Sequence, residues 1–205
     1  TPLIQSLAKS SAESGETVLL VDCQNGEIMR NAGIVYNKTL ADVLFRNADL
    51  TDAQYVTANE HFTAMSAGDA TLDTVLGTLA AISLDYDWVF VGAPNGCSPG
   101  HIRLAGAADT SILTYDSASD YFMRAYWMID ACRRRFPLFD PMLMSVGDLS
   151  TAPEAAELLT GTIAEFLGAP PPYMGHAEGP VFAAPEFSAH IIASIRDMER
   201  ERAAA

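Results

Sequence analysis

The residue best placed to do chemistry is Asp22, which ends the apolar run Thr17–Asp22. A carboxylate in that position can hold a water molecule that is bound to a metal or a phosphate, and it can equally well cap the loop that follows its strand. Gln24, two residues further on, can orient water but carries no charge. The residue types alone leave both roles of Asp22 open.

A second group of candidates follows the apolar run Trp88–Val91. Gly96 suits a turn whatever the function. Cys97 comes directly after it and is either a reactive thiol or, more often in proteins, an ordinary loop or core cysteine. His101 is interpreted as a surface histidine. No metal site is predicted, because the three cysteines share no metal-ligand spacing and suit a reducing cytoplasm.

Short apolar runs alternate with longer helical patterns, which is typical of parallel strands joined by crossover helices. The predicted strands are Thr17–Asp22, Trp88–Val91, Ser111–Tyr115, Met142–Val146 and, more weakly, His61–Ala67. The predicted helices are Leu3–Ala12, Thr39–Arg46, Thr71–Ser83, Ser117–Arg135, Ala152–Leu167 and Phe187–Arg202. A length of 205 residues suits one core. We therefore expect a single domain over residues 1–205, with a mostly parallel sheet flanked by helices on both faces, a three-layer α/β fold.

Charge narrows the choice of partners. The chain has 12 Lys and Arg residues against 26 Asp and Glu, a formal net charge of −14. Such a protein repels phosphate backbones and anionic lipid, so we expect no direct nucleic-acid binding. No apolar run approaches the ~20 residues that span a bilayer, so we expect no transmembrane segment. The expected location is the cytoplasm, with recruitment to a membrane-associated complex as an option.

Several motifs, taken in order, resemble the MinD/ParA group of deviant P-loop ATPases, which includes FlhG-type and TadZ/CpaE-type proteins. The segment Thr1–Ala8 resembles the helix after the phosphate loop, and Gly15–Asp22 resembles the strand that follows it. Thr39–Leu44 resembles the Gly/Thr-Leu-x-Asp-Val-Leu helix of the family. The stretch Asp85–Gly96 resembles Tyr-Asp-x-Val-Ile-Val-Asp-x-Pro-x-Gly. The resemblance implies a P-loop NTPase-like fold and extends to about residue 167.

The resemblance also implies which catalytic groups are changed. The family has an Asp-x-Asp pair where this chain has Asp22 and Gln24, and a magnesium-linked Asp where this chain has Gly92. An adenine-reading Asn is expected near Ser145, where none stands. If Thr1 matches the hydroxyl residue of the phosphate loop, the first strand and the loop itself would precede residue 1. Hydrolysis is therefore predicted to be lost, and the catalytic residues are predicted to be none.

The candidate cofactor-binding residues are those that match the remaining part of the family's nucleotide-binding face: Thr1, Asp22, Gln24, Pro94 and Gly96. No cofactor is expected. If a phosphate loop exists upstream, however, we expect ATP with Mg²⁺ to bind, because backbone amides can hold phosphate without these side chains.

Two helices pose a choice between core and interface. The segment Tyr121–Ile129 is apolar on every side and is either buried or a partner surface. The triplet Arg133–Arg135 suits the negative end of its helix dipole. The final helix, with Ile191, Ile192 and Ile195 on one side, is expected to pack on the domain in preference to a membrane.

The leading hypothesis is a non-hydrolysing MinD/ParA-like pseudo-ATPase. As the resemblance implies, it would act as a homodimer that binds a protein partner and localises or regulates a bacterial assembly, such as a pilus, a flagellum, a secretion system or polysaccharide synthesis machinery. Two alternatives stay open: an active ATP-dependent dimerisation switch with altered switch residues, and a scaffold adaptor with no nucleotide role.

Overall fold

In the computed structural model, residues 2–57, 62–116, 119–147, 150–177 and 185–204 are described. The chain forms two compact units, one of residues 1–94 with 182–205 and the other of residues 95–181, and each is described by itself. The single domain expected over residues 1–205 therefore stays a prediction. Within the described ranges, no helix is long and apolar enough to cross a membrane.

The first unit is built on a four-stranded sheet in the order β2-β3-β1-β4. β1 is parallel to both of its neighbours, and only the short β2 is antiparallel. The strands are β1 (Val18–Asp22), β2 (Tyr55–Val56), β3 (Thr63–Ser66) and β4 (Trp88–Gly92). All five side chains of β1 are buried, as expected for a central strand covered on both faces.

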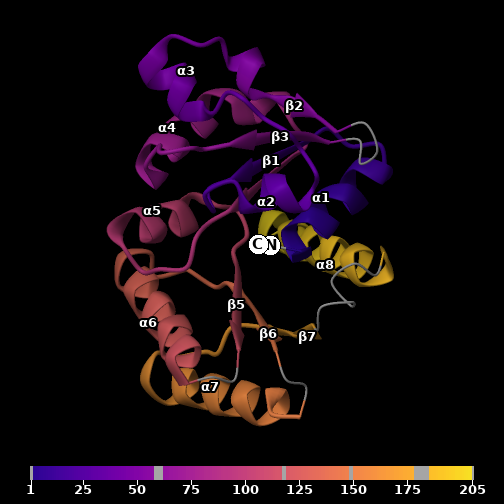
Figure 1. The fold of residues 1–205 in the computed structure, drawn as a ribbon. Helices are drawn as coiled ribbons and strands as arrows, with labels where there is room; N and C mark the ends of the chain where they lie inside the picture. The colour runs from indigo at the N-terminus through magenta and orange to yellow at the C-terminus, as the bar shows by residue number, and fades with distance from the viewer. Residues whose placement is uncertain (1, 58–61, 117–118, 148–149, 178–184, 205) are drawn as a thin grey trace. The chain divides into compact units, whose positions relative to one another are not determined.

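Helices cover both faces of this sheet (Figure 1). Leu19 and Val21 point to the face covered by α3, η1 and α4, whereas Val18 and Leu20 point to the face covered by α1 and α2. Helix α8 packs on α1 and buries Ile191, Ile192 and Ile195, as predicted for the final helix. These elements are α1 (Pro2–Glu13), α2 (Glu27–Asn31), α3 (Leu40–Arg46), η1 (Leu50–Ala53), α4 (Leu72–Ile82), η2 (Ser83–Asp85) and α8 (Pro185–Ala204).

The second unit has a three-stranded parallel sheet in the order β5-β6-β7. One face of it packs against α6 and α7, where Tyr115 and Leu143 meet Ile129, Leu159 and Ile163. The elements are α5 (Pro99–Ala107), β5 (Ile112–Asp116), α6 (Ser119–Arg135), β6 (Met142–Val146), α7 (Ala152–Phe166) and β7 (Tyr173–Ala177).

The expected strands and helices are present to within a few residues, and several short elements had not been predicted. Missing from the prediction were α2, α5, β2, β7 and the two 3-10 turns. Thr71 caps α4 by accepting a hydrogen bond from the Thr74 amide at 3.2 Å. Thr151, at the start of α7, makes no capping hydrogen bond with its side chain. His61 and Ser117, where two predicted elements begin, lie outside the described residues.

The arginine triplet at the end of α6 does more than face the helix dipole. Arg133 is largely buried and donates to the carbonyl oxygens of Phe139 and Leu167, each at 3.2 Å. It also pairs with Asp140 at 3.4 Å. Arg134 is 77% exposed and pairs only locally with Asp130. Arg133 therefore joins the ends of α6 and α7 to the segment that enters β6.

We expect Arg133→Met to lower the free energy of unfolding by about 1–3 kcal/mol, because two carbonyl acceptors and a carboxylate lose their donor. Arg134→Met, in the same triplet, should change it by less than about 0.5 kcal/mol, because its ion pair is exposed. Chemical denaturation followed by circular dichroism measures both. Equal effects of the two substitutions would contradict the role given to Arg133.

Candidate functional site at the ends of β1 and β4

Asp22 lies at the carboxyl end of β1, where ligands bind in open α/β sheets. Its side chain is 1% exposed. Oδ1 accepts a hydrogen bond from the Gln24 amide at 2.7 Å, and Oδ2 accepts one from the Met29 amide at 3.0 Å. Met29 is the third residue of α2, so Asp22 satisfies an amide that the helix itself leaves free. The carboxylate thus caps the loop and the helix that follow its strand.

The loop between β1 and α2 makes a tight left-handed turn at Asn25 and Gly26, with φ of 54° and 76°. Asn and Gly are the residues that adopt this conformation most readily. The turn starts α2 at Glu27 and brings the Met29 amide back to Asp22. Burial raises the pKa of the Cys23 thiol to about 12, and the negative charge of Asp22 contributes to this rise.

Gln24 joins this loop to the end of β4. Its side-chain Nε2 donates to the carbonyl oxygen of Ala93 at 2.8 Å, next to Pro94. The Cys23 amide donates to the carbonyl oxygen of Gly92 at 3.0 Å. The structure therefore brings together three of the predicted site residues, Asp22, Gln24 and Pro94, and joins their two loops by hydrogen bonds within the protein.

Gly92 pairs with Asp22 across the two strands. A Cβ built on Gly92 would overlap the Cδ1 atom of Ile28, and it would lie 3.6 Å from Cδ1 of Ile4. Ile28 is completely buried and packs in the core under α1 and α2. Any side chain at position 92, including the aspartate expected from the resemblance, would require the terminal methyl group of Ile28 to move. The apolar core therefore reaches the position where the family has a metal-linked carboxylate.

Two predicted site residues remain. Thr1 is outside the described residues. Gly96 belongs to the second unit, where an added Cβ would come within 2.7 Å of Cε1 of His101. The His101 ring is partly exposed, and its Nδ1 lies 2.7 Å from Ser98 Oγ at the start of α5. The cofactor-binding role of all five residues stays a prediction.

Near the expected adenine-reading position, the second unit has a buried polar cluster. Ser145 is 1% exposed, and its Oγ lies 2.6 Å from the hydroxyl of Tyr173 and 3.1 Å from Nδ1 of His176. Tyr115 stands beside Ser145 on the neighbouring strand. Burial, with a smaller effect of Tyr173, raises the pKa of Tyr115 above its usual range. Ser145 is thus held between two side chains of β7.

Within the described residues, no group of three or more His, Cys, Asp or Glu side chains is placed to hold a metal ion. Sequence reasoning missed the two residues that define the site, Ile28 and Met29. A helix of five residues is too short to give a periodic pattern. The available signal was the Asn25-Gly26 pair, which marks a left-handed turn directly after Asp22.

We expect Asp22→Asn to lower the free energy of unfolding by about 2–3 kcal/mol, because the new amide group faces a backbone N–H and a charge-assisted hydrogen bond is lost. Asp49→Asn is the matched control, since Asp49 is exposed and should contribute less than about 0.5 kcal/mol. Guanidinium denaturation of the two variants checks this. An Asp22→Asn protein as stable as the wild type would show that the cap is dispensable.

No protein-family model matches the chain, and no curated protein sequence matches it. Solved structures do. A chain of the MinC:MinD cell division protein complex of Aquifex aeolicus superposes with a TM-score of 0.73 at 16% identity, over 94% of this chain and 89% of that one.

Two further matches have the same fold. A plasmid partition protein of Borrelia burgdorferi gives a TM-score of 0.65 at 12% identity, over 94% and 91% of the two chains. Cobyrinic acid a,c-diamide synthase of Mycobacterium smegmatis, solved with ADP and magnesium, gives 0.67 at 14%, over 93% and 87%. The chain therefore has the α/β fold of these MinD- and ParA-type proteins, as predicted for its fold class.

Proposed function

We propose that this protein is a non-hydrolysing member of the MinD/ParA group that acts by binding a protein partner, and that it localises or regulates a bacterial assembly. The observation that carries the proposal is the site at the ends of β1 and β4. Asp22 is committed to two loop amides, and Ile28 occupies the space beside Gly92. Asp22 is buried beneath its loop and position 92 has no carboxylate, so neither position offers a solvent-exposed carboxylate that could order the water molecules of a magnesium ion.

The comparisons bear on the proposal only through the fold. Among the similar structures, one is a chain of a cell division protein complex, and one is a plasmid partition protein. At 12–16% identity such likeness supports only a shared architecture, so the role of this chain rests on the chemistry of its own site.

A surface of α6 suits a partner. Tyr121, Met123 and Trp127 are 42%, 38% and 53% exposed, whereas Ala125, Met128 and Ile129 on the same helix are buried. The guanidinium of Arg124 lies 5.6 Å from the centre of the Tyr121 ring. Aromatic residues, Met and Arg are the types enriched in protein–protein interfaces. One side of α6 therefore packs in the core, and we propose that its exposed side is an interface.

The proposal predicts no magnesium-dependent ATP turnover. Phosphate release by the wild type should equal that of Asp22→Ala, because Asp22 stabilises a loop and takes no part in chemistry. Asp49→Ala is the control for loss of a carboxylate, and circular dichroism confirms that each variant is folded at the assay temperature. Turnover that is lost in Asp22→Ala and kept in Asp49→Ala would overturn the proposal in favour of an active switch.

We further propose a homodimer that does not depend on nucleotide. Light scattering should give the same dimer mass with and without ATP and Mg²⁺, because the loops at the ends of β1 and β4 are already fixed by internal hydrogen bonds. A monomer under both conditions would refute the dimer, and dimerisation only with ATP would refute its independence from nucleotide.

A further inference from the structure

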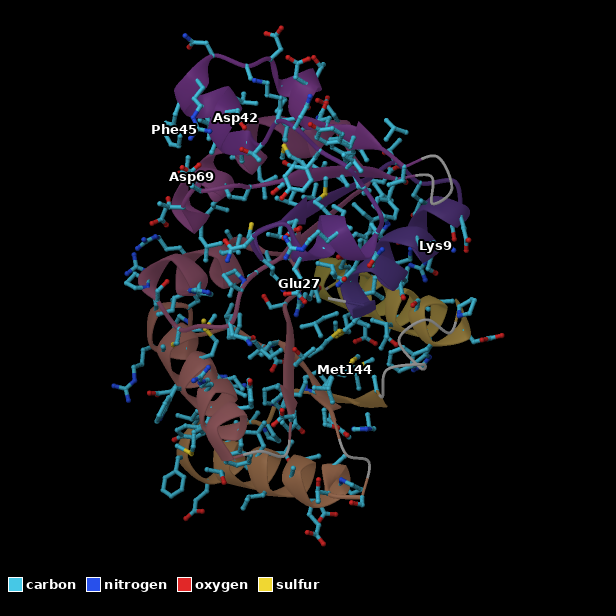
Figure 2. The ribbon with its side chains drawn as sticks, viewed as in Figure 1. Lys9, Glu27, Asp42, Phe45, Asp69 and Met144 are labelled. Carbon is cyan, nitrogen blue, oxygen red and sulfur yellow. The ribbon has the colours of Figure 1, made fainter. Side chains whose placement is uncertain are left out.

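Helix α3 presents two neighbouring apolar side chains to solvent. Leu44 is 41% exposed and Phe45 is 65% exposed, whereas Leu40 and Ala41 are completely buried and Val43 packs against the core. Figure 2 shows Phe45 at the outer edge of the first unit, with Asp42 and Asp69 nearby. Large apolar side chains that are exposed at consecutive positions of one helix are more informative than scattered ones, because single exposed apolar residues are normal.

The helix that carries this pair is held firmly. Thr39 and Asp42 form a capping box at its start, and Asn47, with φ of 56°, ends it. Arg46 bridges Asp42 at 2.7 Å and Asp69 at 3.6 Å. A hydrogen bond from Arg46, followed in effect by two from Thr39, lowers the pKa of Asp42 to about 2. A preformed surface of this kind loses little conformational entropy when it binds.

The surroundings of the pair are strongly acidic. From Lys38 to Asp87 the sequence has one lysine and one arginine against seven aspartates and one glutamate. The single arginine, Arg46, is already shared between two carboxylates. Asp49 and Asp52, on the segment that packs against α3, are exposed, as are Asp69 and Asp73. The exposed Leu44 and Phe45 therefore stand in a field of negative charge.

Resting on the function proposed above, we propose that this face of α3 binds a basic amphipathic segment of a partner protein. Apolar side chains of that segment cover Leu44 and Phe45, and its Lys or Arg residues face the surrounding carboxylates. Charge selects this occupant, because anionic lipid and nucleic acid are repelled and opposite charge steers association. A second copy is disfavoured at this acidic face, because each copy carries 26 Asp and Glu against 12 Lys and Arg.

The test uses the full chain and two labelled peptides of 16 residues, with leucines at helical i, i+3, i+4 spacing. The other positions are Lys in one peptide and Glu in the other. Phe45→Ala is the test variant. Phe166→Ala is its matched control, because Phe166 on α7 is also a phenylalanine that is 65% exposed. Fluorescence anisotropy gives each Kd at several salt concentrations, and circular dichroism checks that both variants are folded.

We expect the Lys peptide to bind the wild type and Phe166→Ala alike, and to bind Phe45→Ala about tenfold more weakly, as for an aromatic anchor. Asp49→Asn combined with Asp52→Asn should weaken binding and reduce its dependence on salt. The Glu peptide should not bind.

Equal Kd values for Phe45→Ala and Phe166→Ala would overturn the proposal, since attraction to the acidic protein would then be unspecific. So would binding of the Glu peptide, of anionic vesicles or of a second copy through Phe45. None of these results alters ATP turnover, so the phosphate-release assay separates failure of this surface from failure of the proposed function.

Discussion

The carboxylate of Asp22 and the two backbone amides that it accepts determine the rest of the site. One amide belongs to the residue two positions along the chain, and the other to the third residue of α2. These two bonds fold the loop back over the end of β1 and place Ile28 beside Gly92. A buried carboxylate needs such donors, because an unpaired charge in the interior is costly. The two hydrogen bonds that stabilise the loop therefore engage both carboxylate oxygens of Asp22.

Because of this arrangement, apolar side chains pack beside the end of β4. On the face of the sheet under α1 and α2, the core contains Ile28 and Met29 beside Val18 and Leu20. Gly92 is compatible with that packing because it has no Cβ to meet Ile28, whose terminal methyl group would have to move to admit a larger residue. The glycine and the isoleucine therefore fit each other.

Much of the fold could be predicted because long apolar strands and amphipathic helices give clear periodic patterns, as at Val18–Asp22 and Leu72–Ile82. The short elements could not, since β2 has two residues and α2 has five. Within the site, sequence left the role of Asp22 open between ligand and cap. Only the return of the Met29 amide, a contact over seven residues, shows that it caps. Sequence also could not show that Ile28 lies against Gly92, because that contact is made between helix α2 and the end of strand β4, which are far apart along the chain.

Charge links the site to the way the protein would find a partner. With a net charge of −14, the chain does not attract the phosphates of nucleic acid or lipid. In the proposed account, the exposed apolar residues on α3 and α6 are the surfaces that other proteins would contact. A fold that holds ADP and magnesium in one similar structure would then serve as a support for such surfaces.

The most direct test of this account is a titration of the ¹⁵N-labelled protein with ATP and Mg²⁺, followed at the amide resonances of Gln24 and Met29. Because both amides donate to Asp22 within a closed loop, their chemical shifts should not change. A saturable shift of both resonances that requires magnesium would show that Asp22 exchanges its loop amides for a metal-bound ligand, and would contradict the account.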